Sequence, residues 1–219
     1  ICSGTTVAFN NSSYFTGVPA SPVDASTTAT FFWNFGDGTN SSLEEPTKLF
    51  KNEGTTLKTF YIAFTLNLNG CDTTITDSVK VYPKVTAQLN TDDIQLCFND
   101  VIEIRNNSIN ATNYLWSFSD ATPDSATTTL DSYDYLALNA TANDTIHTHI
   151  YLKASNVNCE SFDTISVQIY PEIKPAIAPS VSSGCSPLAV DWQNTSTGGV
   201  LSYNWDFGNG EQSTEAIKT

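Results

Sequence analysis

The chain has 219 residues, a length that fits one to three domains. Its 9 Lys and Arg stand against 23 Asp and Glu, and this net charge of −14 excludes a basic surface for nucleic acid or anionic membrane. No run of about 18 apolar residues occurs, so no transmembrane helix is expected. Charged residues make up only 15% of the chain, while Thr, Ser and Asn are abundant, as in secreted β-proteins. Because the chain begins at Ile1 and has no Met, we expect a piece of a longer protein.

Alternating side chains predict β-strands along the chain, and helical periodicity is missing. Three aromatic residues share one face of the clearest strand: Phe31, Trp33 and Phe35. Gly36-Asp37-Gly38 follows as a predicted turn, because glycine accepts positive φ and aspartate accepts bonds from nearby backbone N–H groups. Related aromatic stretches recur at residues 114–120 and 203–210. The remaining predicted strands lie at residues 60–68, 73–82, 148–154 and 164–170. A short strand with an Asn/Ser turn after it is predicted at residues 7–12, 102–108 and 189–196.

The cysteines mark a repeat. They are Cys2, Cys71, Cys97, Cys159 and Cys185. From Cys71 to Cys159 is 88 residues, and from Cys97 to Cys185 is again 88. Tyr-Pro pairs that begin at residues 82 and 170 keep the same period, which indicates a repeat architecture. We therefore predict modules at 1–83 and 84–171, and the N-terminal half of a third module at 172–219.

The motif from Trp33 to Gly38, with the closing Val81-Tyr82-Pro83, resembles the PKD (polycystic kidney disease) repeat. The resemblance covers two full modules and a partial one, and module two departs from it with Ser119-Asp120-Ala121 in place of Gly-Asp-Gly. It implies tandem immunoglobulin-like β-sandwiches in an extended array, extracellular and non-enzymatic. Cysteine-framed acidic repeats of this kind also resemble those of large Bacteroidetes surface proteins such as SprB-like gliding adhesins.

This resemblance implies a stalk or filament segment of a large secreted cell-surface protein in adhesion, and a role in gliding motility. The implied partners are other modules of the same polypeptide, an unidentified extracellular ligand and the type IX secretion machinery. The alternative is a spacer in a secreted multidomain hydrolase, where PKD repeats also occur. The chain has no Gly-x-Ser-x-Gly or His-Glu-x-x-His motif, so we expect no enzyme activity and no cofactor.

The cysteines favour disulfides over a metal site, because no Cys-x-x-Cys occurs and each cysteine stands alone at a repeat landmark. We predict that Cys2 pairs with Cys71 and that Cys97 pairs with Cys159. Each bond would add roughly 4 kcal/mol to stability in the chain-entropy model. Cys185 is expected to have no partner within the 219 residues.

The repeated aromatic residues favour a hydrophobic core over a carbohydrate-binding platform, because one strand position carries them in every module. The predicted core residues are Trp33, Phe35, Trp116, Phe118, Trp205 and Phe207. Trp33 and Trp116 are expected to pack near the disulfides, as in immunoglobulin-like sandwiches.

Three further sites have a functional and a simpler interpretation. Calcium could bind at Asp37, but residue 209 is Asn in the third module, and a turn-forming role is simpler. His147 and His149 could form a metal pair on one strand face, but no third ligand is evident, and a surface pair is simpler. Five sites match a Bacteroidetes O-glycosylation pattern: Thr73, Ser78, Ser125, Thr145 and Thr164. The simpler explanation is that strands favour threonine.

Overall fold

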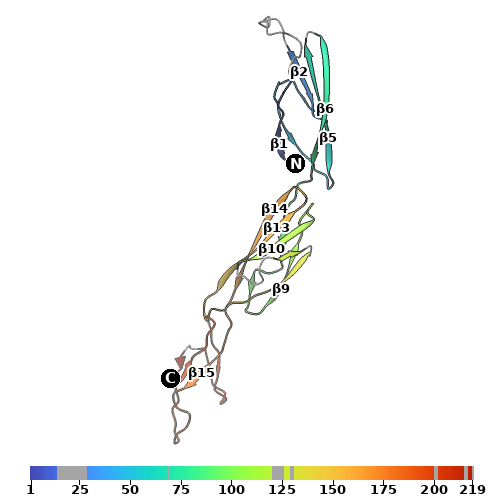
Figure 1. Cartoon of the computed structure of the whole chain (residues 1–219). Coiled ribbons are helices and arrows are strands. Elements are labelled where there is room, and N and C mark those ends of the chain that lie inside the picture. Colours follow the sequence, from blue (N-terminus) through green and yellow to red (C-terminus); the bar gives the residue numbers. More distant parts are fainter. Residues whose placement is uncertain are drawn as a thin grey trace. The chain divides into compact units, whose positions relative to one another are not determined.

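The computed structural model describes residues 1–13, 29–68, 70–119, 126–128, 131–199, 202–214 and 217–218. All regular elements in these residues are β-strands (Figure 1), which confirms the predicted all-β fold class. No helix within the described ranges could cross a membrane. The strands belong to two compact units of the chain. The module boundaries predicted at residues 83 and 171 stay predictions.

The first unit comprises Ile1–Thr86, Ser108–Asn113 and Ala154–Ser161. Its main strands are β1 (Thr5–Ala8), β2 (Ala29–Asn34), β3 (Asn40–Ser41), β4 (Thr47–Phe50), β5 (Lys58–Leu68) and β6 (Cys71–Val81). β1 pairs with β4 in one antiparallel sheet, and the other sheet has the strand order β3-β2-β5-β6. The β5–β6 hairpin (Figure 1) pairs two eleven-residue strands, in register from Lys58↔Val81 to Leu68↔Cys71.

Both sheets of the first unit contribute to one hydrophobic core. On β5, Phe60 and Phe64 are buried while Tyr61, which points to the opposite face, is 74% exposed. Phe50 of β4 and Trp33 of β2 bring the two sheets together in this core. Two antiparallel sheets that face each other across a core form an immunoglobulin-like β-sandwich, as the sequence predicts.

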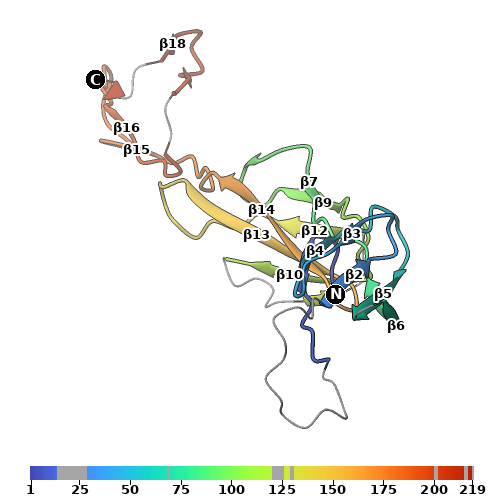
Figure 2. The same cartoon turned by 90° about the horizontal axis from the view of Figure 1, so that it is seen from above.

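The second unit comprises Ala87–Asn107, Tyr114–Lys153 and Phe162–Thr219. Its strands, three of which extend into residues of the first unit, include β7 (Leu89–Asn90), β8 (Gln95–Leu96), β9 (Val101–Asn106), β10 (Asn113–Phe118), β11 (Ala126–Thr128), β12 (Ser132–Leu136), β13 (Ile146–Ser155) and β14 (Glu160–Ile169). Two sheets have the strand orders β11-β10-β13-β14-β8 and β12-β9-β7. β13 and β14 lie side by side (Figure 2). The later strands are β15 (Ile177–Pro179), β16 (Trp192–Asn194), β17 (Trp205–Asp206), β18 (Gln212–Ser213) and β19 (Ile217–Lys218), in sheets β15-β16-β19 and β17-β18.

The core of the second unit also draws on two sheets. Trp116 of β10 and Ile150 of β13 are fully buried in one hydrophobic cluster with Tyr135 of β12. β8 pairs in parallel with the end of β14, where Leu96 lies opposite Ile169. The residue that follows Leu96 therefore lies at the C-terminal end of β14.

The turn after the first aromatic strand has the positive-φ glycine that the sequence predicts, and a like turn follows the aromatic stretch that begins at residue 203. The Gly36 N–H donates to Asn34 Oδ1 at 2.9 Å, and the Gly208 N–H donates to Asp206 Oδ1 at the same distance. Both glycines have positive φ, +73° and +76°. The two turns are therefore alike although they lie in different parts of the chain.

Replacing Gly36 with alanine is expected to lower the free energy of unfolding by about 3 kcal/mol, because strain and overpacking add. At φ +73° the new Cβ would lie 2.4 Å from the backbone O of Tyr61. Gly38→Ala is the matched control: its φ is +89° but no atom lies within 4 Å, so we expect a loss of about 1 kcal/mol. Amide hydrogen exchange in β2 and β5 measures both losses. Equal losses would contradict a role for the Tyr61 contact.

Two buried asparagines, which no sequence motif marks, hold the ends of β6 and β14. Asn52 Nδ2 donates to the backbone O of Val81 at 2.8 Å, and Asn139 Nδ2 donates to the backbone O of Ile169 at 2.9 Å. The two asparagines are only 4% and 3% exposed. Asn52 and Asn139 are 87 residues apart, one fewer than the period of 88, so a comparison at the repeat spacing does not align them.

Replacing Asn139 with alanine is expected to cost about 2 kcal/mol, because the buried carbonyl of Ile169 loses its donor and a cavity forms. Hydrogen exchange at the C-terminal end of β14 should rise accordingly. The exposed Asn90→Ala variant is the control, with an expected change within about 0.5 kcal/mol. A loss at Asn139 no larger than at Asn90 would contradict the assigned hydrogen bonds.

Candidate functional site

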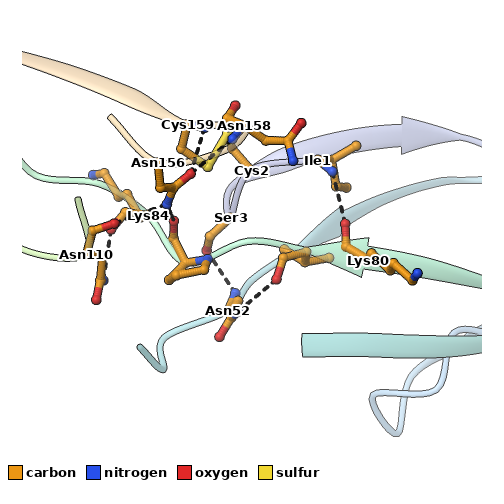
Figure 3. Close-up of a disulfide and its surroundings, with 12 residues drawn as sticks. Ile1, Cys2, Ser3, Asn52, Lys80, Lys84, Asn110, Asn156, Asn158 and Cys159 are labelled. Atoms are coloured by element: carbon orange, nitrogen blue, oxygen red, sulfur yellow. Dashed lines mark hydrogen bonds between the residues drawn. A yellow bond between two sulfur atoms is a disulfide. The ribbon is translucent and has the colours of Figure 1, made fainter. Parts of the chain in front are cut away.

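A disulfide joins Cys2 and Cys159, two residues of the first unit that are 157 positions apart in sequence. Their Cα atoms are 5.5 Å apart. Cys159 is buried and Cys2 is half-buried. Figure 3 shows that the bond lies where the first residues of the chain meet the turn between β13 and β14. It is the covalent link between the most distant parts of this unit's sequence.

We call the place where the first residues of the chain meet the β13–β14 turn the junction. Backbone hydrogen bonds hold its Cys2 side. Cys2 forms an isolated parallel bridge with Tyr82, the residue that follows β6. The Tyr82 N–H donates to Ile1 O at 2.8 Å, and the Ser3 N–H donates to Tyr82 O at 2.9 Å. The Ile1 nitrogen also donates to Lys80 O at 2.9 Å (Figure 3). These bonds fix Cys2 beside the C-terminal end of β6.

The Cys159 side depends on one asparagine. Asn156 Oδ1 accepts from the backbone N–H groups of Asn158 at 3.1 Å and Cys159 at 2.9 Å, which forms the turn before β14. Asn156 Nδ2 donates to the backbone O atoms of Pro83 at 3.3 Å and Asn110 at 3.1 Å (Figure 3). A single side chain therefore shapes the turn that carries Cys159 and binds it to the segment after β6.

The Cys2–Cys159 bond replaces the predicted Cys2–Cys71 pair. Cys71 opens β6, whereas Cys2 lies beside Tyr82 just after the other end of that strand. Eleven residues of strand separate the two positions, about 36 Å at about 3.3 Å per residue. No disulfide can span that distance.

The predicted Cys97–Cys159 pair fails for the same reason. Cys97 follows Leu96, which lies opposite Ile169 at the end of β14, whereas Cys159 directly precedes the start of that strand. Ten residues of strand separate the two ends, about 33 Å at about 3.3 Å per residue. Cys71, Cys97 and Cys185 are exposed free thiols in the structure.

Trp33 lies away from the disulfide, contrary to the expected packing, and the same expectation for Trp116 stays a prediction. Trp33 stacks on Phe64 at a centroid distance of 4.2 Å, and the strand register places both beside Ile75. Tyr82, beside Cys2, lies seven residues further along the chain, about 23 Å at the rise of a strand.

The burial of the repeated aromatic residues differs along the chain. Trp33, Phe35, Trp116 and Phe118 are buried. Trp205 and Phe207 are half-buried. These two rings stack on each other at a centroid distance of 6.2 Å.

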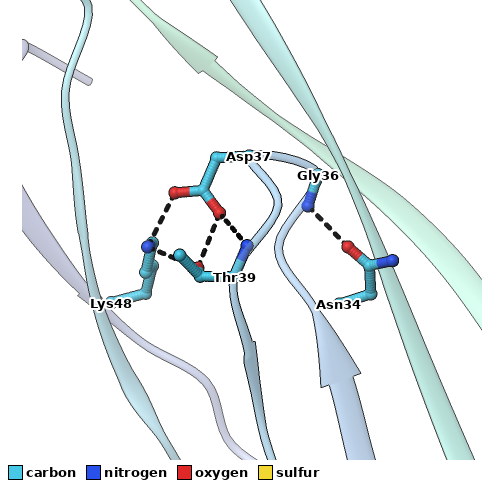
Figure 4. A network of polar contacts seen from close by, with 5 residues as sticks. All are labelled: Asn34, Gly36, Asp37, Thr39 and Lys48. Atoms are coloured by element: carbon cyan, nitrogen blue, oxygen red, sulfur yellow. Dashed lines mark hydrogen bonds and ion pairs between the residues drawn. The ribbon is translucent and has the colours of Figure 1, made fainter.

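Asp37 belongs to an ion-pair network (Figure 4). Its Oδ2 lies 2.7 Å from Lys48 Nζ, and its Oδ1 accepts from Thr39 Oγ1 at 2.6 Å and from Thr39 N at 3.0 Å. Burial is the largest single influence and raises the pKa, but the bonds from Lys48 and Thr39 and the Lys48 charge together outweigh it and lower the pKa from 3.8 to about 2. The Lys48 ammonium thus already neutralises this carboxylate. Calcium binding at Asp37 stays a prediction.

Asp37 is expected to make the first unit less stable in acid. Because its folded pKa lies below the unfolded value of 3.8, the contribution is complete above about pH 4 and is lost as the pH falls toward 2. The side chain is 23% exposed, so we expect about 1 kcal/mol after solvent screening. Urea denaturation at about pH 5 and about pH 2 measures the change. If Asp37→Asn keeps the full acid sensitivity, other carboxylates cause it.

The remaining predicted sites are scattered over exposed positions of the chain. His147 and His149 are exposed on one face of β13, with the buried Thr148 between them. Within the described ranges no three His, Cys, Asp or Glu residues are grouped so that they could hold a metal. The predicted glycosylation residues Thr73, Ser78, Thr145 and Thr164 are exposed. Ser125, and residues 120–121 of the departing turn, lie outside the described residues.

No family model matches the chain, and no curated protein is similar to it. Among solved structures, the chain is similar to the amphioxus IgVJ-C2 molecule (TM-score 0.32, 11% identity, covering 76% of this chain and 99% of that one). It is also similar to the protocadherin GammaB4 extracellular domain (TM-score 0.36, 11% identity, covering 80% of this chain and 34% of that one). A third similar structure is that of the Clostridium thermocellum CbhA fibronectin(III)-like modules (TM-score 0.31, 13% identity, covering 77% of this chain and 86% of that one). Likenesses this distant carry no conclusion about function.

Proposed function

We propose that the chain is a non-catalytic repeat segment of a large secreted cell-surface protein, where it forms part of an adhesive stalk or filament. The observation that carries the proposal is the Cys2–Cys159 disulfide. Stable disulfides belong to oxidising compartments outside the cytosol. The two cysteines also come from different predicted modules, and a covalent bond between successive modules restricts their independent movement, as a stalk requires.

The surface of the chain supports the same proposal. β6 exposes nearly its entire length and carries threonine, serine and aspartate, so this edge strand is hydrophilic. Polar and charged edge strands resist pairing with other chains, which suits repeats held at high local concentration. The like turns at Gly36 and Gly208 support the PKD resemblance within this proposal. Type IX secretion, gliding and O-glycosylation are finer parts of it.

The test uses an antibody against residues 1–219, applied to intact producing cells and to reducing gels of the cell and medium fractions. We expect a surface signal, removed by external protease, from a polypeptide many times larger than 23.8 kDa. Lysed cells provide the control for antibody access. A medium-sized band released into the medium that co-purifies with hydrolase activity would make the chain an enzyme spacer. A cytosolic band would overturn both interpretations.

A further inference from the structure

The contacts that follow β6 recur after β14, 88 residues later. In the first unit, Thr86 and Ile109 exchange backbone hydrogen bonds of 3.1 and 2.9 Å. In the second unit, Lys174 and Thr197 exchange two such bonds of 3.0 Å. Both pairs are isolated antiparallel bridges. The chain after Tyr170-Pro171 therefore repeats the local pairing of the chain after Tyr82-Pro83.

Cys97 occupies the same backbone position as the bonded Cys2. The Tyr82 N–H donates to Ile1 O at 2.8 Å, and the Tyr170 N–H donates to Leu96 O at 2.8 Å. Cys2 and Cys97 are the next residues after these two acceptors. One of the two equivalent cysteines is in a disulfide, and the other is an exposed thiol.

A cavity lies beside Cys97, whereas the turn that carries Cys159 fills the corresponding space beside Cys2. Its volume is about 750 Å³, and its lining includes Cys97, Pro171, Glu172 and Gly198. The counterparts of three of these residues surround the turn that carries Cys159. They are Cys2, which bonds to Cys159, and Pro83 and Asn110, whose backbone O atoms both accept from Asn156.

Gly198 preserves the shape of this cavity. Its counterpart Asn110 has a φ of +63°, and its Nδ2 donates to Lys84 O at 2.9 Å. Gly198 has a φ of +110°, and a Cβ there would lie 2.6 Å from the backbone O of Glu172, the residue 88 positions after Lys84. Residue 198 thus lies close to the backbone of residue 172, as residue 110 lies close to residue 84. The cavity beside Cys97 therefore corresponds to the space that the Asn156–Cys159 turn fills beside Cys2.

We propose that Cys97 is the bridging cysteine of a second junction of this kind. Its partner is a cysteine 88 residues beyond Cys159, on the hairpin turn of the following repeat of the same polypeptide. This inference rests on the proposal that the chain belongs to a repeat array. Each thiol gives up its proton, one S–S bond forms, and the two electrons pass to an external disulfide oxidant, which is reduced to its dithiol. By the same rule, Cys71 is bonded to the early cysteine of the preceding repeat.

The first test maps the disulfides of the protein isolated from its own cells. Free thiols are blocked with N-ethylmaleimide, the protein is digested without reduction, and linked peptides are identified by mass spectrometry. We expect Cys2 linked to Cys159, and Cys97 linked to a cysteine peptide from outside residues 1–219. An alkylated Cys97, or a Cys97 linked to Cys71, Cys159 or Cys185, would overturn the inference. The cell-surface test is separate, so a surface protein with an alkylated Cys97 would leave the proposed function standing.

A second test supplies the missing turn to the chain itself. A copy of residues 132–171 is added after Thr219, which places the copied Cys159 in the expected register. We expect the copied cysteine to bond to Cys97. Cys185→Ser should leave this bond intact, whereas Cys97→Ser should leave the copied cysteine open to alkylation. A bond between the copied cysteine and Cys185 would overturn the inference. If the extended chain does not fold, the peptide map of the natural protein decides alone.

Discussion

Replacing Cys2 with serine is expected to lower the free energy of unfolding of the first unit by about 5 kcal/mol. The Cys2–Cys159 bond closes a loop of 157 residues, and the chain-entropy model assigns about 5 kcal/mol to a loop of that length. Asn156 would also hold a turn that no longer has its covalent anchor. Urea denaturation, with hydrogen exchange in β1 and β6 as the reporter of this unit, measures the loss.

Cys71→Ser is the matched control for Cys2→Ser. Cys71 is an exposed free thiol, so its replacement is expected to change stability by less than about 0.5 kcal/mol. Peptide mapping of the 219-residue chain should show the Cys2–Cys159 link in the control and no link in Cys2→Ser. If both variants lose a similar free energy of unfolding, the result would favour the Cys2–Cys71 pairing over the Cys2–Cys159 bond.

Replacing Trp116 with alanine is expected to destabilise the second unit by about 4 kcal/mol. The side chain is fully buried at the centre of a core shared by two sheets, and truncating a buried aromatic residue to alanine costs about 3–5 kcal/mol. Hydrogen exchange in β10 and β13 is the measurement, because fluorescence would change with the loss of the indole itself. The first unit, which has its own core, should keep its protection.

Two further variants separate volume from polarity at Trp116. Its indole N–H is buried without a hydrogen-bond partner, so Trp116→Phe removes an unsatisfied donor and should cost only about 1–2 kcal/mol. Leu115→Ala, on the other face of the same strand and 36% exposed, should cost less than about 1 kcal/mol. A loss at Leu115 equal to that at Trp116 would contradict the assigned core face.

The strands and the core were predictable because both depend on local alternation. The period-two pattern of Phe31, Trp33 and Phe35 predicts which face is buried, and β2 contains the first two of these residues. Turn chemistry at Gly36 was predictable for the same local reason. Trp205 and Phe207 are only half-buried, because fewer neighbours cover them in the part of the chain that is described.

The disulfide was not predictable from spacing. A repeat period shows that each full module has a cysteine near each end, and it does not show which ends meet. In each full predicted module the two cysteines lie at opposite ends of a ten- or eleven-residue strand. In the first, Cys71 opens β6, and Cys2 lies beside Tyr82, just after the other end of that strand. The roles of the buried Asn52 and Asn139 were not predictable for a related reason, since both act through long-range hydrogen bonds to strand ends.

The Cys2–Cys159 bond also sets the route of mechanical force through the chain. A pull applied between Ile1 and the C-terminal part passes from Cys2 directly to Cys159, and the residues between them carry no tension. Once the bond is reduced, forced unfolding of the residues between the two cysteines can release up to about 520 Å of chain, at about 3.3 Å for each of the 157 residues. The redox state of one bond therefore decides whether unfolding under force can lengthen this segment.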